Sequence, residues 1–166
     1  MKRLLRSAVA AACAAVLMAA CGGGVSQVEA FVPDRIYAFG DEHSVLTDTG
    51  RKYSINALAS SGTGIDCESN PLWIQAVANV YGYRFKQCQG TATEARAITL
   101  ASAGATVATL TAQIDAQAAA GFASKGLALV LVGLHDVRQI YEARAVGETE
   151  DALQAKARQR GVDLAL

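Results

Sequence analysis

Short apolar runs separated by polar segments predict a small number of buried strands. Residues 35–39 and 127–132 are the two clearest, and residues 96–100 form a third, shorter candidate. The run 127–132 has no polar position, which is typical of a strand buried on both faces of a parallel sheet. Residues 47–70 are rich in Ser, Gly, Thr and Asp, so we expect a long loop between the first strand and the next element.

A helix is predicted over residues 71–82, where apolar side chains recur at helical spacing. Asn70 is the expected N-cap, Pro71 the first helical residue and Gly82 the end. The expected packing stripe consists of Trp73, Val77 and Tyr81.

Two further helices are predicted on the same grounds. Residues 107–120 form the first, which we expect to end at Gly121. Residues 148–159 form the second, broken by Gly161. The expected inward positions are Val107, Leu110, Ile114 and Ala118 in the first helix, and Ala152, Leu153 and Ala157 in the second.

The N-terminus has the pattern of an export signal. Lys2, Arg3 and Arg6 precede an apolar run that is too short to remain as a membrane span, and Cys21 follows it at once. The order Leu-Met-Ala-Ala-Cys resembles a bacterial lipobox, which implies cleavage before Cys21 and lipid attachment to its thiol. An ordinary secretory signal cut elsewhere, or a simple N-terminal anchor, is the alternative.

The predicted organisation follows from this signal. Residues 1–20 are the signal peptide, residues 21–34 a lipidated tether with a flexible Gly22-Gly23-Gly24 run, and residues 35–166 one domain. We expect a bacterial cell-envelope protein, facing the periplasm or the surface, that is attached to the membrane by lipid without spanning it.

Cysteine usage agrees with an oxidising compartment. Cys67 and Cys88 are the only thiols of the folded part, so we expect one disulfide, which would contribute roughly 3 kcal/mol. Two free buried thiols are the alternative. Neither cysteine has a spaced histidine or cysteine partner, so no zinc site is implied.

Charge gives no sign of a nucleic-acid partner. Without the three basic residues of the signal, twelve basic residues face fifteen acidic ones, and the exported chain is mildly acidic.

Two motifs follow the two firm strands. The first is Gly40-Asp41-Glu42-His43-Ser44, and the second, after the strand 127–132, is Gly133-Leu134-His135-Asp136. They resemble the Gly-Asp-Ser and Gly-x-Asn-Asp motifs of the GDSL (SGNH) lipase/esterase family. A weaker match to the family's second block places Gly104 in a small-residue loop. The resemblance runs from residue 35 onward and corresponds to the N-terminal part of such an enzyme.

The resemblance implies an α/β fold, a three-layer α/β/α parallel sheet whose later strands are missing from this sequence. It also implies site roles. Glu42 stands at the nucleophile position, where the family has Ser. Gly104 and His135 stand at the oxyanion-donor positions, with His135 in place of Asn. The chain stops before any counterpart of the family's Asp-x-x-His.

Ser44 is an alternative nucleophile, with His43 or His135 as its base. The other interpretation makes Ser44 an N-cap or turn residue.

The acidic and imidazole groups at the two strand ends have two further interpretations. They form a divalent-cation site if the strand ends adjoin. Alternatively they form a polar network in which the two aspartates cap the turns that follow them. The residues concerned are Asp41, Glu42, His43, His135 and Asp136. We expect no cofactor and no resident metal.

Three functions are consistent with these patterns. The first is a cell-envelope lipoprotein of the GDSL type whose acyl-ester hydrolysis is impaired by the substituted positions. The second is a non-catalytic lipoprotein that binds acyl or glycan ligands on the same scaffold. The third is a truncated relic. Whether the chain is an enzyme is therefore left open by the sequence.

Overall fold

The computed structural model describes residues 29–89 and 95–165, and the fold below is that of the unit Val32–Leu166. Cys21, the predicted signal and most of the predicted tether lie outside the described residues. Among the described residues no helix is both long and apolar enough to cross a membrane.

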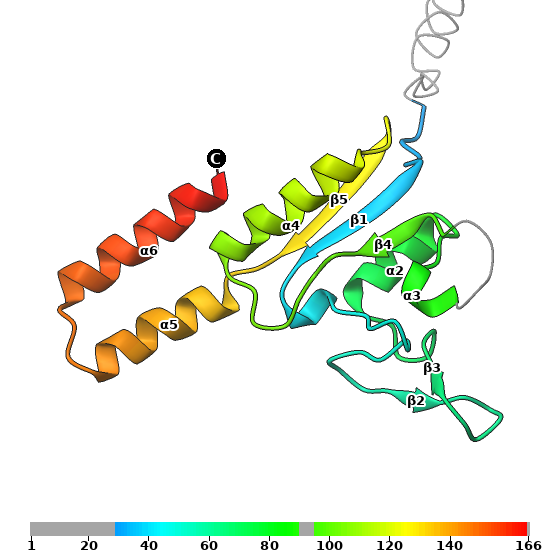
Figure 1. Cartoon of the computed structure of the whole chain (residues 1–166), viewed down its shortest axis with the longest axis horizontal. Coiled ribbons are helices and arrows are strands. Elements are labelled where there is room, and N and C mark those ends of the chain that lie inside the picture. The colour runs from blue at the N-terminus through cyan, green and yellow to red at the C-terminus, as the bar shows by residue number, and fades with distance from the viewer. Residues whose placement is uncertain (1–28, 90–94, 166) are drawn as a thin grey trace, which may run out of the picture. The chain divides into compact units, whose positions relative to one another are not determined.

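A parallel sheet of three strands forms the centre of this unit (Figure 1). Strand β1 (Arg35–Gly40) lies between β4 (Ala97–Thr99) and β5 (Gly126–Leu131) and runs parallel to both. The three predicted strands and their parallel direction are thus confirmed. Gly40 pairs with Leu131, so β1 and β5 end at the same edge of the sheet.

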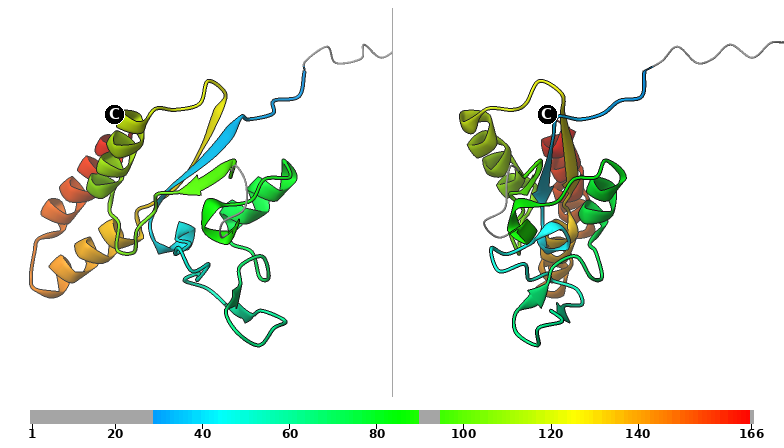
Figure 2. Two further views of the ribbon diagram at one scale, coloured as in Figure 1. Left: turned by 45° about the vertical axis from the view of Figure 1, so that its right-hand side comes forward. Right: turned by 90° about the vertical axis from the view of Figure 1, so that its right-hand side faces the viewer.

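Both faces of β1 are covered by helices because its side chains alternate between two apolar clusters. Ile36 and Ala38 belong to one cluster with residues of α2 (Trp73–Val80), while Tyr37 and Phe39 belong to another with Leu110 of α4 (Val107–Ala120). Figure 2 shows helices on the two sides of the sheet. The fold is therefore a mixed α/β arrangement, as the sequence predicts.

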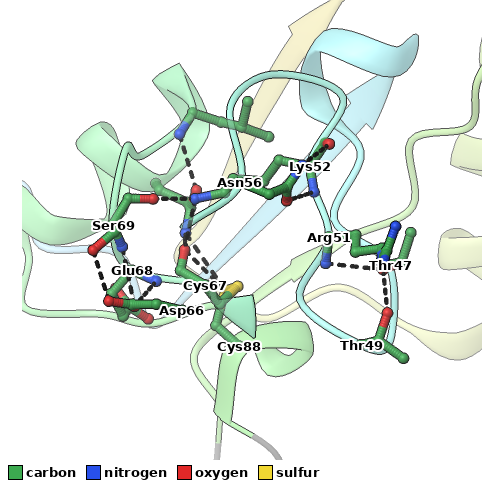
Figure 3. The surroundings of a disulfide bond; sticks show 12 residues. Thr47, Thr49, Arg51, Lys52, Asn56, Asp66, Cys67, Glu68, Ser69 and Cys88 are labelled. Carbon is green, nitrogen blue, oxygen red and sulfur yellow. Dashed lines mark hydrogen bonds between the residues drawn. A yellow bond between two sulfur atoms is a disulfide. The ribbon is translucent and has the colours of Figure 1, made fainter. Parts of the chain in front are cut away.

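The predicted long loop contains more structure than its composition suggests. It begins after the short 3-10 helix η1 (Glu42–Ser44) and includes a small antiparallel pair, β2 (Ala57–Leu58) and β3 (Ile65–Asp66). Cys67 follows β3 and forms a disulfide with Cys88 of α3 (Lys86–Gln89), with their Cα atoms 5.3 Å apart (Figure 3). The predicted disulfide is confirmed.

The start of α2 differs from the prediction. Leu72, not Asn70, is the N-cap, and its backbone N–H donates to the Gln75 side chain at 2.9 Å. Asn70 has a φ of 52°, in the left-handed region, and the helix begins at Trp73, so Pro71 lies outside it. The fully buried face consists of Ile74, Gln75 and Ala78, and the predicted stripe of Trp73, Val77 and Tyr81 packs partly buried beside it.

Helix α4 has the predicted bounds and ends at Gly121, but its inward face is partly polar. Val107 and Leu110 are buried as expected, together with Gln117. Ile114 is 37% exposed and Ala118 is also exposed, so these two inward assignments are wrong. The reason is that Gln113 is committed to the end of β1, where its side chain holds backbone groups of Gly40.

The C-terminal part is a pair of helices, α5 (Leu134–Ala145) and α6 (Glu150–Ala165). The sequence does not predict α5, in which Asp136 alone is buried. Helix α6 continues through Gly161, against the prediction. Arg160 forms ion pairs with Asp136 and Asp163. These contacts offset the low helix propensity of Gly161. Of its three expected inward residues Leu153 is buried, whereas Ala152 and Ala157 are exposed.

Burial of β5 on both faces is also a wrong expectation. Leu129 is buried, but Val130 and Leu131 are 44% and 43% exposed. In the described part of the chain β5 is an edge strand, and so its side chains are only partly covered.

Candidate functional site

Three distant segments meet at the carboxyl ends of β1 and β5. Helix η1 follows β1, α5 follows β5, and Gly104 lies in the loop before α4. The chain passes from β1 to β4 on one side and then crosses back over β1 to β5 on the other side. Ligand sites of doubly wound sheets lie where the strand order reverses in this way. The topology therefore marks this edge as the candidate site.

The carboxylate of Glu42 lies at the centre of this edge. The backbone N–H of Gly104 donates to its Oε2 at 3.0 Å, and Nε2 of His135 lies 2.9 Å from Oε1 and 2.8 Å from Oε2. The backbone N–H of Glu42 itself is a further donor. The side chains of Glu42 and His135 are only 11% and 18% exposed. The two residues predicted as oxyanion donors thus both contact the side chain at the nucleophile position.

The hydrogen bonds to Glu42 favour its ionised form. Burial is the largest single influence on its pKa and acts to raise it. The hydrogen bonds from Gly104, from Glu42's own N–H and from His135 together outweigh burial and lower the pKa of Glu42 from 4.5 to about 2. An ionised carboxylate can only accept hydrogen bonds. The hydrogen bond between Glu42 and His135 therefore requires a proton on Nε2 of His135.

Gly40 brings the two strand ends close enough for this contact. Its φ is 119°, and a Cβ atom built on it would lie 1.8 Å from the carbonyl oxygen of Leu131. The side chain of Gln113 accepts from the Gly40 N–H at 2.8 Å and donates to its carbonyl at 3.0 Å. This clamp satisfies both backbone groups where the ladder ends.

Asp41 and His43 form a separate pair. The Asp41 carboxylate accepts from the His43 backbone N–H at 3.1 Å and lies 2.9 Å from its Nδ1. Asp41 therefore caps the turn that follows it, as the polar-network interpretation expects. The His43 ring is partly exposed and lies 5.6 Å from the ring of Tyr53, which is 65% exposed.

Asp136 caps a different helix from the one expected. Its Oδ2 accepts from the backbone N–H of Val107, the first residue of α4, at 2.9 Å, instead of capping a following turn. Arg160 lies 3.1 Å from Oδ1 as an ion pair, without the alignment of a hydrogen bond.

The acidic and imidazole side chains at the two strand ends therefore do not form one cluster, because they pair with separate partners. Within residues 29–89 and 95–165 no three His, Cys, Asp or Glu side chains come together as metal ligands, which removes the support for the divalent-cation interpretation.

Ser44 is fully buried at the end of η1. Its hydroxyl accepts from the indole N–H of Trp73 at 3.2 Å, and its carbonyl accepts from the Thr99 hydroxyl at 2.7 Å. The hydrogen bonds described for Ser44 reach neither His43 nor His135. This geometry favours the turn interpretation of Ser44 over a nucleophile.

Lys52 is a buried charged residue that the sequence does not reveal. It is 5% exposed, and its ammonium donates to the carbonyls of Cys67 and Asn70 at 3.1 Å each and to that of Ser69 (Figure 3). Burial lowers the pKa of Lys52, while Asp66 and Glu68 act in the opposite direction. A lysine in a polar loop gives no sequence signal of burial, and its role here is to hold the loop before α2.

No family model, curated protein or solved structure matches this chain. The candidate site is therefore inferred from the geometry of this chain alone.

Proposed function

We propose that this chain is a cell-envelope lipoprotein built on a scaffold of the GDSL ester-hydrolase type, with acyl-ester hydrolysis impaired. The supporting observation is the convergence on one carboxylate. Gly104 and His135 lie 62 and 93 residues from Glu42 in sequence, yet both contact it. These are the positions that the resemblance assigns to the nucleophile and its oxyanion donors.

Hydrolysis is impaired because the N–H donors of the site already bind the negatively charged carboxylate of Glu42. Ester cleavage requires free N–H groups at the place where the oxyanion develops. Here the Glu42 carboxylate accepts those hydrogen bonds, and its negative charge would repel an oxyanion. Ser44, the nearby hydroxyl, is buried against Trp73.

The activity is tested with the full chain, exported and purified in mild detergent, on a short-chain p-nitrophenyl ester. We expect no turnover above background from the unaltered chain or from Ser44→Ala. Turnover that only Ser44→Ala abolishes would replace this proposal with an active esterase that has a shifted nucleophile. A serine-directed phosphonate gives an independent readout, since we expect no covalent labelling.

Lipid attachment is tested separately by labelled palmitate. Label in the unaltered chain and none in Cys21→Ser is expected. Equal labelling of both would contradict the lipobox interpretation.

A non-catalytic binding protein for acyl or glycan ligands is the second candidate. The neighbouring rings of His43 and Tyr53, close to the candidate site, favour it because exposed aromatic rings stack on sugar faces. Glycan binding that is lost in Tyr53→Ala, with no turnover in any variant, would favour this candidate over the first.

A further inference from the structure

The Glu42 carboxylate is held in the way a bound anion is held. Its donors come from three places in the chain: the N–H of Glu42 itself, the N–H of Gly104 in the loop before α4, and Nε2 of His135 in α5. Two of the three belong to other segments, so they do not depend on the Glu42 side chain for their position. A set of converging N–H donors recognises a carboxylate whether or not it is attached to the chain.

The local charge also suits an anion. Asp41 and Asp136, which adjoin Glu42 and His135 in sequence, accept from His43 and Val107 respectively, and Arg160 pairs with Asp136. Both neighbouring carboxylates therefore have partners of their own, which lessens their repulsion of an anion held by the donors of Glu42.

We propose that these donors form a carboxylate-binding site that Glu42 occupies as an internal ligand, and that shortening Glu42 opens the site to small external carboxylates. The substitution Glu42→Ala removes a methylene and a carboxylate, which are the atoms of acetate. The inference rests on the proposed function, because the acid that ester hydrolysis releases carries a carboxylate, as acetate does. It does not require the chain to hydrolyse an ester.

The test uses the exported full chain and thermal unfolding in sodium acetate, compared with sodium chloride at equal ionic strength. We expect acetate to raise the midpoint of Glu42→Ala by roughly 4 °C at ten times its Kd. The unaltered chain and Glu42→Gln, whose side chain still fills the site, should respond equally to the two salts. The double variant Glu42→Ala with His135→Ala should lose the acetate response.

A second readout locates the binding. Acetate should shift the backbone amide resonance of Gly104 in Glu42→Ala and leave it in place in Glu42→Gln. If Glu42→Ala unfolds without ligand, recovery of its circular dichroism in acetate but not in chloride would support the site, and no recovery would overturn it.

Two results would overturn the inference in a folded protein. One is an acetate effect on Glu42→Ala no larger than that of chloride, and the other is an equal acetate effect on the unaltered chain, which places binding elsewhere. Failure of the proposed function is distinguishable, because ester turnover by the unaltered chain would contradict that proposal whatever acetate does to Glu42→Ala.

Discussion

Asp136, in the first turn of α5, accepts a hydrogen bond from the backbone N–H of Val107, the first residue of α4. One buried carboxylate therefore lies near the amino ends of two helices, where the helix dipoles favour negative charge. This hydrogen bond links α4, which packs on the sheet, to α5, which follows the edge strand β5.

This contact predicts a large effect of truncating Asp136. We expect Asp136→Ala to lower the free energy of unfolding by about 2 to 3 kcal/mol, because the buried Val107 N–H loses its acceptor. Asp136→Asn keeps an acceptor oxygen and should cost about half as much. Urea unfolding measures both, and equal stability of Asp136→Ala and the unaltered chain would contradict the assignment.

Glu42 predicts a dependence of stability on acidity. Its pKa is about 2 in the folded chain, below the ordinary value of 4.5, so the unfolded chain binds the proton more readily. The stabilisation is present above pH 4.5 and is lost as the pH falls towards 2. We expect it to amount to about 2 kcal/mol after allowance for partial exposure to water.

The measurement compares the unaltered chain with Glu42→Gln by denaturant unfolding between pH 6 and 2.5. Their difference in free energy of unfolding should shrink over the acid part of this range. Glu142→Gln, at a side chain that is 58% exposed, is the matched control and should show little change. A constant difference for Glu42→Gln would mean that the carboxylate gains nothing from its donors.

Ser44 and Trp73 predict an energetic coupling without a catalytic effect. Ser44→Ala and Trp73→Phe each remove one partner of the 3.2 Å hydrogen bond. In a double-mutant cycle we expect a coupling of about 1 kcal/mol in unfolding free energy. A coupling near zero would show that the indole and the hydroxyl stabilise the fold independently of each other.

Lys52 predicts a local loss of order. Lys52→Met preserves much of the buried stem but leaves the carbonyls of Cys67, Ser69 and Asn70 without their donor. We expect a loss of about 2 kcal/mol and faster proteolysis between residues 47 and 70. The exposed neighbour Arg51 provides the control, since Arg51→Met should leave both measurements nearly unchanged.

The sequence predicts the sheet well because its strands are apolar runs that alternate with helices. It also places the two motifs at one edge, since parallel strands joined by a crossover end together. The bounds of α4 follow from apolar spacing and Gly121. The disulfide follows because Cys67 and Cys88 are the only two cysteines outside the predicted signal and lipobox.

What the sequence misses depends on polar side chains that point inward. Gln75 and Gln113 satisfy backbone groups at the start of α2 and the end of β1, so positions that look solvent-facing are in fact contacts. Lys52 is buried for the same kind of reason. Helix α5 does carry Leu134, Val137 and Tyr141 at helical spacing, but these side chains are exposed. Buried contacts of His135 and Asp136 hold its first turn instead.

The pairing of Glu42 with His135 is likewise invisible in the sequence. In the sequence the two residues stand 93 positions apart, and only the 2.8 Å distance between their side chains shows that they contact each other.

The close approach of Gly40 to Leu131 separates what can vary at this edge from what cannot. Any side chain at residue 40 would enter the space of the neighbouring carbonyl and wedge the two strands apart. Residues 42 and 135, by contrast, lie beyond the strand ends and take no part in the pairing of β1 with β5. Other chemistry at this edge is therefore compatible with the paired strands only while residue 40 remains glycine.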